Sequence, residues 1–285
     1  MFRRLGSMGR PMRSLIVIIG VACAALGVLG AALMAPVSAQ ATRVTECTAI
    51  NICYCVATDM KPAIDANVSK IRQAIAEQKS ADKAIGYMSL PISTVGGSYF
   101  GVNVDIAAKI KAHVEKRFGA ISLWVLNPGE PNFSLPREAN GADYMLMWTR
   151  VLEGPSGTGE DFDFFYFAGP ADFAAALGLT GEGDMEKIDA LYEQRYADDE
   201  QLRKAVKDGK VSKPAFRKYY ALRASIAFSY GAHDEWNILR LLNERRRGGT
   251  QFGVANQIAS FYDGRATAPA AAEQGISSGY MGRCN

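Results

Sequence analysis

The segment from Lys83 to Gly119 constrains the fold more than any other part of the chain. It begins with an apolar stretch, Ala84 to Leu90, that is typical of a buried strand. A turn rich in proline and glycine follows, from Pro91 to Gly101, and an amphipathic helix then runs from Asn103 to Phe118. A strand, a glycine loop and a helix in that order form half of a parallel α/β unit. Such folds bind ligands at the loops that follow their strands.

Two more strands continue the same pattern. We expect them from Ile121 to Leu126 and from Phe162 to Phe167, with a buried helix from Ala142 to Leu152 between them and a short helix from Ala171 to Leu179 after them. A separate helix from Pro62 to Gln78 carries apolar residues at every third or fourth position. Because strands alternate with helices at this spacing, the sequence predicts an α/β fold with a three-layer parallel sheet.

The pattern changes after Gly183, where helical segments follow one another. We expect helices near residues 185–206, from Lys213 to Tyr230 and from His233 to Arg246, and a last helix or strand from Gln251 to Tyr262. The chain therefore divides into five parts. They are a targeting segment (1–41), an irregular cysteine-rich lead-in with its helix (42–80), an α/β domain (81–180), a helical C-terminal extension (181–265) and a flexible tail (266–285).

Residues 1–41 have the layout of a secretory signal peptide. Four arginines precede an apolar run from Leu15 to Ala35, and two small-residue candidates for a cleavage site follow, Val37-Ser38-Ala39 and Ala39-Gln40-Ala41. We therefore expect a periplasmic or secreted protein. The alternative is an uncleaved anchor in the inner membrane, because about 20 apolar residues suffice to span a bilayer.

The charge of the chain is concentrated in this segment. Removing its four arginines and no acids changes the formal net charge from +3 to −1. The remaining body has no electrostatic basis for binding nucleic acid, so we expect no nucleic-acid partner and no membrane contact except through residues 15–35. No motif implies a cofactor.

The body contains four cysteines, Cys47, Cys53, Cys55 and Cys284. An even number in an exported chain predicts two disulfides. Cys53 and Cys55 are too close in sequence to pair with each other, and one pattern ties Cys284 to the N-terminal cluster, but the pairing stays open. A metal site is the weaker interpretation, because the spacing matches no zinc motif.

Polar residues and glycines follow all three predicted strands. The first loop offers hydroxyls and glycine amides beside a helix N-terminus, which suits a phosphate or a sugar hydroxyl. It is neither a P-loop nor a dinucleotide-binding G-x-G-x-x-G motif. Because loops after parallel strands converge, we predict one crevice for a small polar ligand. Its candidate residues are Ser89, Pro91, Ser93, Gly96, Gly97, Asn127, Glu130 and Gly169.

Several short motifs stand at the strand ends and helix starts of this region: Gly86-Tyr87-Met88-Ser89-Leu90-Pro91-Ile92-Ser93, Asn127-Pro128, Ala142-Asp143-Tyr144-Met145 and Asp163-Phe164-Phe165-Tyr166-Phe167. Together they resemble the motifs of nucleoside 2-deoxyribosyltransferase-like domains. The resemblance covers residues 83–179 and implies a flavodoxin-like or deoxyribosyltransferase-like sheet, a nucleoside-, nucleotide- or sugar-like ligand, and transfer or hydrolysis of an N-glycosidic bond.

The sequence departs from this family at the catalytic position. Leu90 stands where the family usually has glycine, and the helix after the third strand lacks the family's catalytic glutamate. Asp163 and Asp172 are the remaining candidates for a nucleophile, although Asp172 also suits the cap of its helix. Asp234 and Glu235, beside His233, are interpreted as charges at a helix start rather than metal ligands. We therefore expect ligand binding rather than catalysis, with a non-catalytic scaffold or an N-glycosidic enzyme as alternatives.

Overall fold

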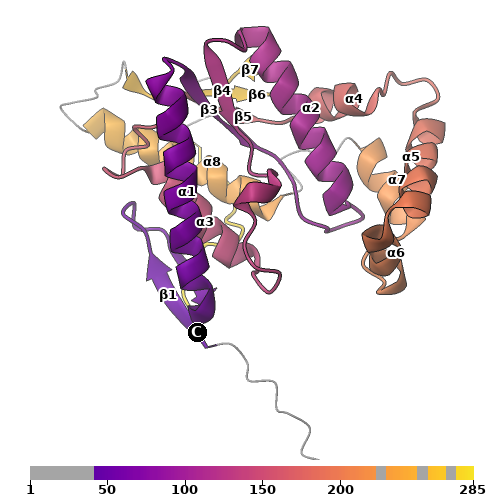
Figure 1. Cartoon of the computed structure of the whole chain (residues 1–285), viewed down its shortest axis with the longest axis horizontal. Helices are drawn as coiled ribbons and strands as arrows, with labels where there is room; N and C mark the ends of the chain where they lie inside the picture. The colour runs from indigo at the N-terminus through magenta and orange to yellow at the C-terminus, as the bar shows by residue number, and fades with distance from the viewer. Residues whose placement is uncertain (1–41, 223–228, 249–255, 268–273) are drawn as a thin grey trace, which may run out of the picture. The chain divides into compact units, whose positions relative to one another are not determined.

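A mostly parallel five-stranded sheet forms the centre of the computed structural model, which describes residues 42–222, 229–248, 256–267 and 274–285. Its strand order is β4-β3-β5-β6-β7. The strands are β3 (Ala84–Ser89), β4 (Leu123–Leu126), β5 (Phe164–Phe167), β6 (Ala259–Tyr262) and β7 (Arg265–Ala266). The first four run parallel, and β7 pairs antiparallel with β6 (Figure 1). The predicted α/β class and parallel sheet are therefore confirmed.

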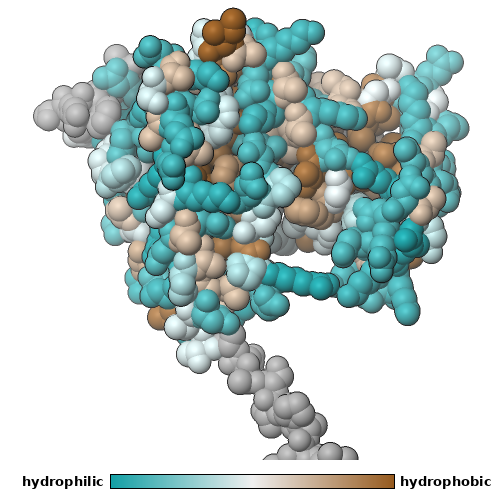
Figure 2. Space-filling view, in the orientation of Figure 1, coloured by the Kyte–Doolittle hydropathy of each residue, from teal (hydrophilic) through white to brown (hydrophobic). Residues whose placement is uncertain are grey.

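Helices cover both faces of the sheet. One face packs on α1 (Lys61–Ser80), α3 (Gly141–Glu153) and α8 (Tyr230–Gly248), and the other packs on α2 (Phe100–Phe118) and α4 (Pro170–Leu177). Successive strand side chains point to opposite faces, so Tyr87 belongs to the first core and Met88 to the second. Figure 2 shows a mostly hydrophilic outer side on α1, whose apolar stripe is buried against the sheet.

A helical segment is inserted in the connection between β5 and β6. It contains α5 (Asp184–Asp198), α6 (Glu200–Lys207) and α7 (Lys213–Ala221), which join the core of the α2 face. The chain then returns through α8 and adds β6 and β7, so part of the predicted C-terminal extension is sheet. Helix α7 ends before the predicted Tyr230, and residues 223–228 lie outside the described residues.

An antiparallel hairpin replaces the irregular lead-in that the sequence predicts. It consists of β1 (Arg43–Cys47) and β2 (Cys53–Ala57), and it is followed by short 3-10 turns, η1 (Thr58–Met60) and, further on, η2 (Pro131–Phe133). Disulfides join Cys47 to Cys53 and Cys55 to Cys284, which confirms the two predicted bridges. Such bonds persist in oxidising compartments outside the cytosol.

The C-terminal residues 274–285, which we call the C-terminal strap, are held along α8. The carboxylate of Asp234 accepts the backbone N–H groups of Gly279 and Tyr280, each at 2.7 Å. The side chain of Asn237 exchanges two hydrogen bonds with the backbone of Ile276. The sequence predicts a flexible tail from residue 266; in its described part, α8 side chains bind the backbone of residues 274–280, and Gly282 and Cys284 bond to the hairpin.

The predicted targeting segment, residues 1–41, lies outside the described residues. Among the helices that the structure describes, none has the length and apolarity needed to cross a bilayer.

Candidate functional site

Helix α8 covers the C-terminal end of β3 with a buried carboxylate. Glu235 accepts hydrogen bonds from the Tyr87 hydroxyl, at 2.5 Å, and from the Ser89 hydroxyl. Burial raises the pKa of Glu235 to about 7, although both hydrogen bonds favour the charged form. Burial also raises the pKa of Tyr87, so its hydroxyl stays neutral and acts as the donor in the hydrogen bond to Glu235. Glu235 is thus a core residue and not the helix-start charge that the sequence predicts.

The same helix also covers the end of β5. The Trp236 ring packs on Phe167 with 4.9 Å between ring centroids. The point between β3 and β5, where open parallel sheets usually bind ligands, is therefore filled by protein side chains. Three predicted ligand residues at this end of the sheet, Ser89, Pro91 and Gly169, are buried rather than exposed to a crevice.

An open cavity of about 710 Å³ lies beside this blocked position, and we call it the loop cavity. Three predicted ligand residues, Ser93, Gly96 and Gly97, contribute to its lining. The remaining lining comes from α7 and its preceding turn, from the first turns of α8 and from the C-terminal strap: Val95, Lys210, Ala215, Lys218, Tyr219, Leu222, Ser229, Tyr230, His233 and Tyr280.

Local hydrogen bonds fix the glycine loop that borders this cavity. The Ser98 hydroxyl lies 2.6 Å from the carbonyl oxygen of Ser93 and 2.7 Å from that of Val95, and it accepts the Val95 N–H. The loop also touches α7, because a Cβ added at Gly97 would lie 2.3 Å from the carbonyl oxygen of Ala215. Glycine is required there, both for this contact and for a φ of +103°.

A buried tyrosine connects the loop to α7. The Tyr220 hydroxyl donates to the Asn103 side chain at 2.8 Å and accepts the backbone N–H of Tyr99 at 3.1 Å. Asn103 in turn donates to the carbonyl of Ile92. The two contacts of Tyr220 join residues more than a hundred positions apart, so α7 and the glycine loop form one wall of the cavity.

The loop cavity is electrostatically one-sided. Lys210, Lys218 and His233 line it, whereas none of the lining residues that the structure describes carries a carboxylate. Neither lysine forms an ion pair with a residue of the described ranges. The cavity therefore favours a ligand that carries negative charge or many hydrogen-bond acceptors.

The loop after β4 contributes no residue to the lining of the loop cavity. Asn127 is buried and accepts the Gly129 N–H at 2.9 Å, which closes the turn after β4. Glu130 pairs with Lys111 at 2.6 Å. Neither residue lines the loop cavity.

The two predicted nucleophiles occupy different places. Asp163 precedes β5, so it lies at the N-terminal edge of the sheet, where it accepts the Ile85 N–H at 2.7 Å. Asp172 caps α4 by accepting the Gly169 N–H at 3.0 Å, and its other oxygen accepts the Tyr166 hydroxyl at 2.7 Å. Burial raises the pKa of Asp172. Both of its oxygens are thus occupied by protein donors, as the helix-cap interpretation requires.

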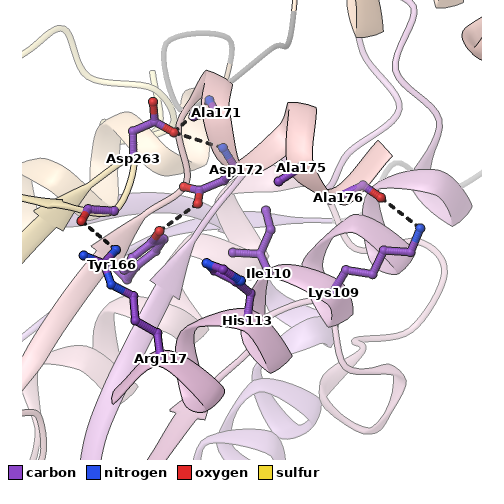
Figure 3. A pocket seen from close by; sticks show the side chains of 11 residues that line it. Lys109, Ile110, His113, Arg117, Tyr166, Ala171, Asp172, Ala175, Ala176 and Asp263 are labelled. Atoms are coloured by element: carbon purple, nitrogen blue, oxygen red, sulfur yellow. Dashed lines mark hydrogen bonds between the residues drawn. The ribbon is translucent and has the colours of Figure 1, made fainter. Parts of the chain in front are cut away.

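Asp172 lines a second cavity of about 500 Å³ between α2 and α4. Figure 3 shows His113 between Arg117 and Lys109 along α2, with Asp172 and Asp263 on the opposite side. Asp263 accepts the N–H groups of Ala171 and Asp172 at 2.8 and 3.0 Å, so it serves the start of α4. Because cations and carboxylates face one another across this cavity, it offers no net preference for an anion.

Several residues of the loop cavity could not be found from the sequence. Lys210, Lys218, Tyr230 and Tyr280 lie in segments without a ligand motif, and the fold brings them to the glycine loop. The only usable signal was the composition of the loop itself, which identified Ser93, Gly96 and Gly97.

Comparisons with protein-family models, with curated proteins and with solved structures find no match to this chain. The residues that the structure describes also contain no group of three or more histidine, cysteine, aspartate or glutamate side chains that could hold a metal ion.

Proposed function

We propose that this protein binds a small polar ligand of the nucleoside, nucleotide or sugar class in the loop cavity. The observation that carries this proposal is the lining of the cavity, which combines the glycine loop after the first strand with cationic, hydroxyl and aromatic side chains. Its volume of about 710 Å³ lies within the range of small-molecule sites.

The side chains around the cavity favour binding without chemistry. Transfer or hydrolysis of an N-glycosidic bond needs a carboxylate nucleophile and usually a second acid or base. The described lining residues include no carboxylate, Glu235 is sealed in the core, and Asp172 lines the other cavity. A binding protein is therefore a better proposal than a glycosidase or a transferase.

We also propose a flavodoxin-like or deoxyribosyltransferase-like fold and export from the cytosol. The order β4-β3-β5-β6 corresponds to the flavodoxin-like order 2-1-3-4 when the strands are numbered from β3. The two disulfides support an oxidising location, which agrees with the periplasmic or secreted localisation that the N-terminal sequence predicts.

A ligand screen with a blocking variant tests the proposed function. The full chain, with both disulfides formed, is titrated calorimetrically with nucleosides, nucleotides and sugars. Ser93→Trp should weaken binding at least about tenfold, because a large side chain at this exposed position enters the cavity. Ser122→Trp, at an exposed position before β4, is the matched control and should bind normally.

Two results would refute the proposal. Binding that Ser93→Trp leaves unchanged would place the ligand elsewhere. No binding by any compound of the three classes would favour the non-catalytic scaffold, for which the helical segment α5 to α7 would be the contact surface.

A further inference from the structure

The two walls of the loop cavity differ in chemistry. The first wall consists of the glycine loop, the turn before α7 and α7 itself. The second consists of the first turns of α8 and the C-terminal strap. Only the first wall carries lysines, and the second carries tyrosine rings and a histidine. This division constrains the ligand more closely than the proposed function does.

The first wall presents donors to an oxyanion. The backbone N–H groups of Gly96 and Gly97 donate to no acceptor among the residues that the structure describes. Nothing lies within 4 Å of a Cβ added at Gly96, so the loop tip is open to a ligand. Lys218 lies about one turn along α7 from Ala215, the residue that Gly97 touches, and Lys210 lies in the preceding turn. Free amides and ammonium groups together suit a phosphate.

The second wall presents two aromatic rings. The Tyr230 and Tyr280 rings meet edge to face with 6.0 Å between centroids. The large side chain of Tyr230 lies at the mouth of the cavity and is 62% exposed. The strap holds Tyr280 in place through its backbone bond to Asp234. Exposed aromatic side chains in such positions stack on the rings of bases and similar groups.

We infer that the loop cavity takes a phosphate monoester of a compound with a planar ring, such as a nucleoside monophosphate, and that the phosphate lies at the Gly96–Lys218 wall while the ring lies against Tyr230. This inference rests on the proposed function. The absence of any carboxylate among the described lining residues supports it, because no fixed negative charge opposes the phosphate.

Matched ligand pairs test the inference on the full chain. The four common nucleoside monophosphates, their nucleosides, ribose 5-phosphate and inorganic phosphate are titrated calorimetrically at two salt concentrations. At least one monophosphate should bind about ten times more tightly than its nucleoside and than ribose 5-phosphate. Added salt should weaken binding of the monophosphate more than binding of the nucleoside.

Variants separate the two walls. Lys218→Ala should weaken the monophosphate about tenfold without changing the nucleoside, whereas Lys116→Ala, an exposed lysine of α2, should change neither. Tyr230→Ala should weaken the monophosphate about tenfold but not ribose 5-phosphate, and Tyr230→Phe should retain binding because it keeps the ring.

The outcomes are distinguishable. Equal affinity for monophosphate and nucleoside, or equal effects of Lys218→Ala on both, would overturn the inference and leave the proposed function intact. Monophosphate affinity unchanged by Tyr230→Ala would overturn the placement of the ring. No binding of any compound in the wider screen would overturn the inference together with the proposed function.

Discussion

The buried carboxylate of Glu235 should make the stability of this protein fall as pH rises. Its pKa is about 7 in the folded state and 4.5 in its ordinary state, so folding favours the protonated form. The stabilisation is complete below pH 4.5 and is lost as pH rises through 7. A shift of about 2.5 pKa units corresponds to about 3 kcal/mol of unfolding free energy. The side chain is almost fully buried, so solvent screens this contribution little.

Glu235→Gln isolates this contribution. Glutamine resembles the protonated acid in shape and is likewise uncharged, with an amide group and a carbonyl oxygen that can bond to Tyr87 and Ser89. The variant minus wild-type difference in unfolding free energy should therefore increase by about 3 kcal/mol between pH 4.5 and pH 8. Burial also raises the pKa of Asp172, but this residue is present in both proteins and its contribution cancels in the difference.

Urea denaturation followed by tryptophan fluorescence at half-unit pH steps measures the two curves, with Trp236 next to the substituted residue. Glu244→Gln is the matched control, because Glu244 is exposed on the same helix and pairs with Arg240 at the surface. Its curve should run parallel to that of the wild type. A Glu235→Gln curve that also runs parallel to the wild type would refute the coupling between burial and protonation argued here.

Three further predictions concern the disulfides, the glycine loop and the cap of α4. Replacing Cys55 and Cys284 by serine should lower the unfolding free energy by about 5 kcal/mol, because this bridge spans 229 positions. Replacing Cys47 and Cys53, which are 6 positions apart, should lower it by about 2 kcal/mol. Urea denaturation measures both losses, and equal losses would contradict the chain-entropy argument. Gly97→Ala should destabilise the protein by more than Gly96→Ala, because only the former clashes with α7, and the order of their thermal midpoints checks this. Asp172→Ala should cost about 2 kcal/mol of unfolding free energy, since it removes a helix cap and the acceptor of Tyr166, and a neutral result would count against the cap.

The sequence predicts best the elements that form through interactions between neighbouring residues in the chain. The strand from Ala84, the glycine loop and the helix ending at Gly119 appear where apolar spacing and turn chemistry place them. The sequence does not distinguish helix from strand for β6, because the short segment Ala259–Tyr262 shows no decisive period. It becomes a strand by pairing with β5, a contact about a hundred positions away in the chain.

The candidate site was harder to predict than the fold because its far wall is assembled from distant segments. Gly96 and Gly97 could be identified from their own loop, but the Tyr280 that faces them depends on the hydrogen bonds between Asp234 and the C-terminal strap. In the sequence, Asp234 looked like a charge at a helix start. The actual cap is Ser229, whose hydroxyl accepts the Ala232 N–H, and this leaves Asp234 free to bind the strap.

The position of the loop cavity follows from the course of α8. In an open parallel sheet the ligand site lies where the strand order reverses, which here is between β3 and β5. Glu235 and Trp236 occupy that position. Glu235 accepts a hydrogen bond from Ser89 of β3, and the Trp236 ring packs on Phe167 of β5. A ligand cannot displace both without leaving a buried carboxylate and two hydroxyls unpaired. Only the outer part of the glycine loop therefore stays open, and the surface that faces it there is made by α7, the first turn of α8 and the strap.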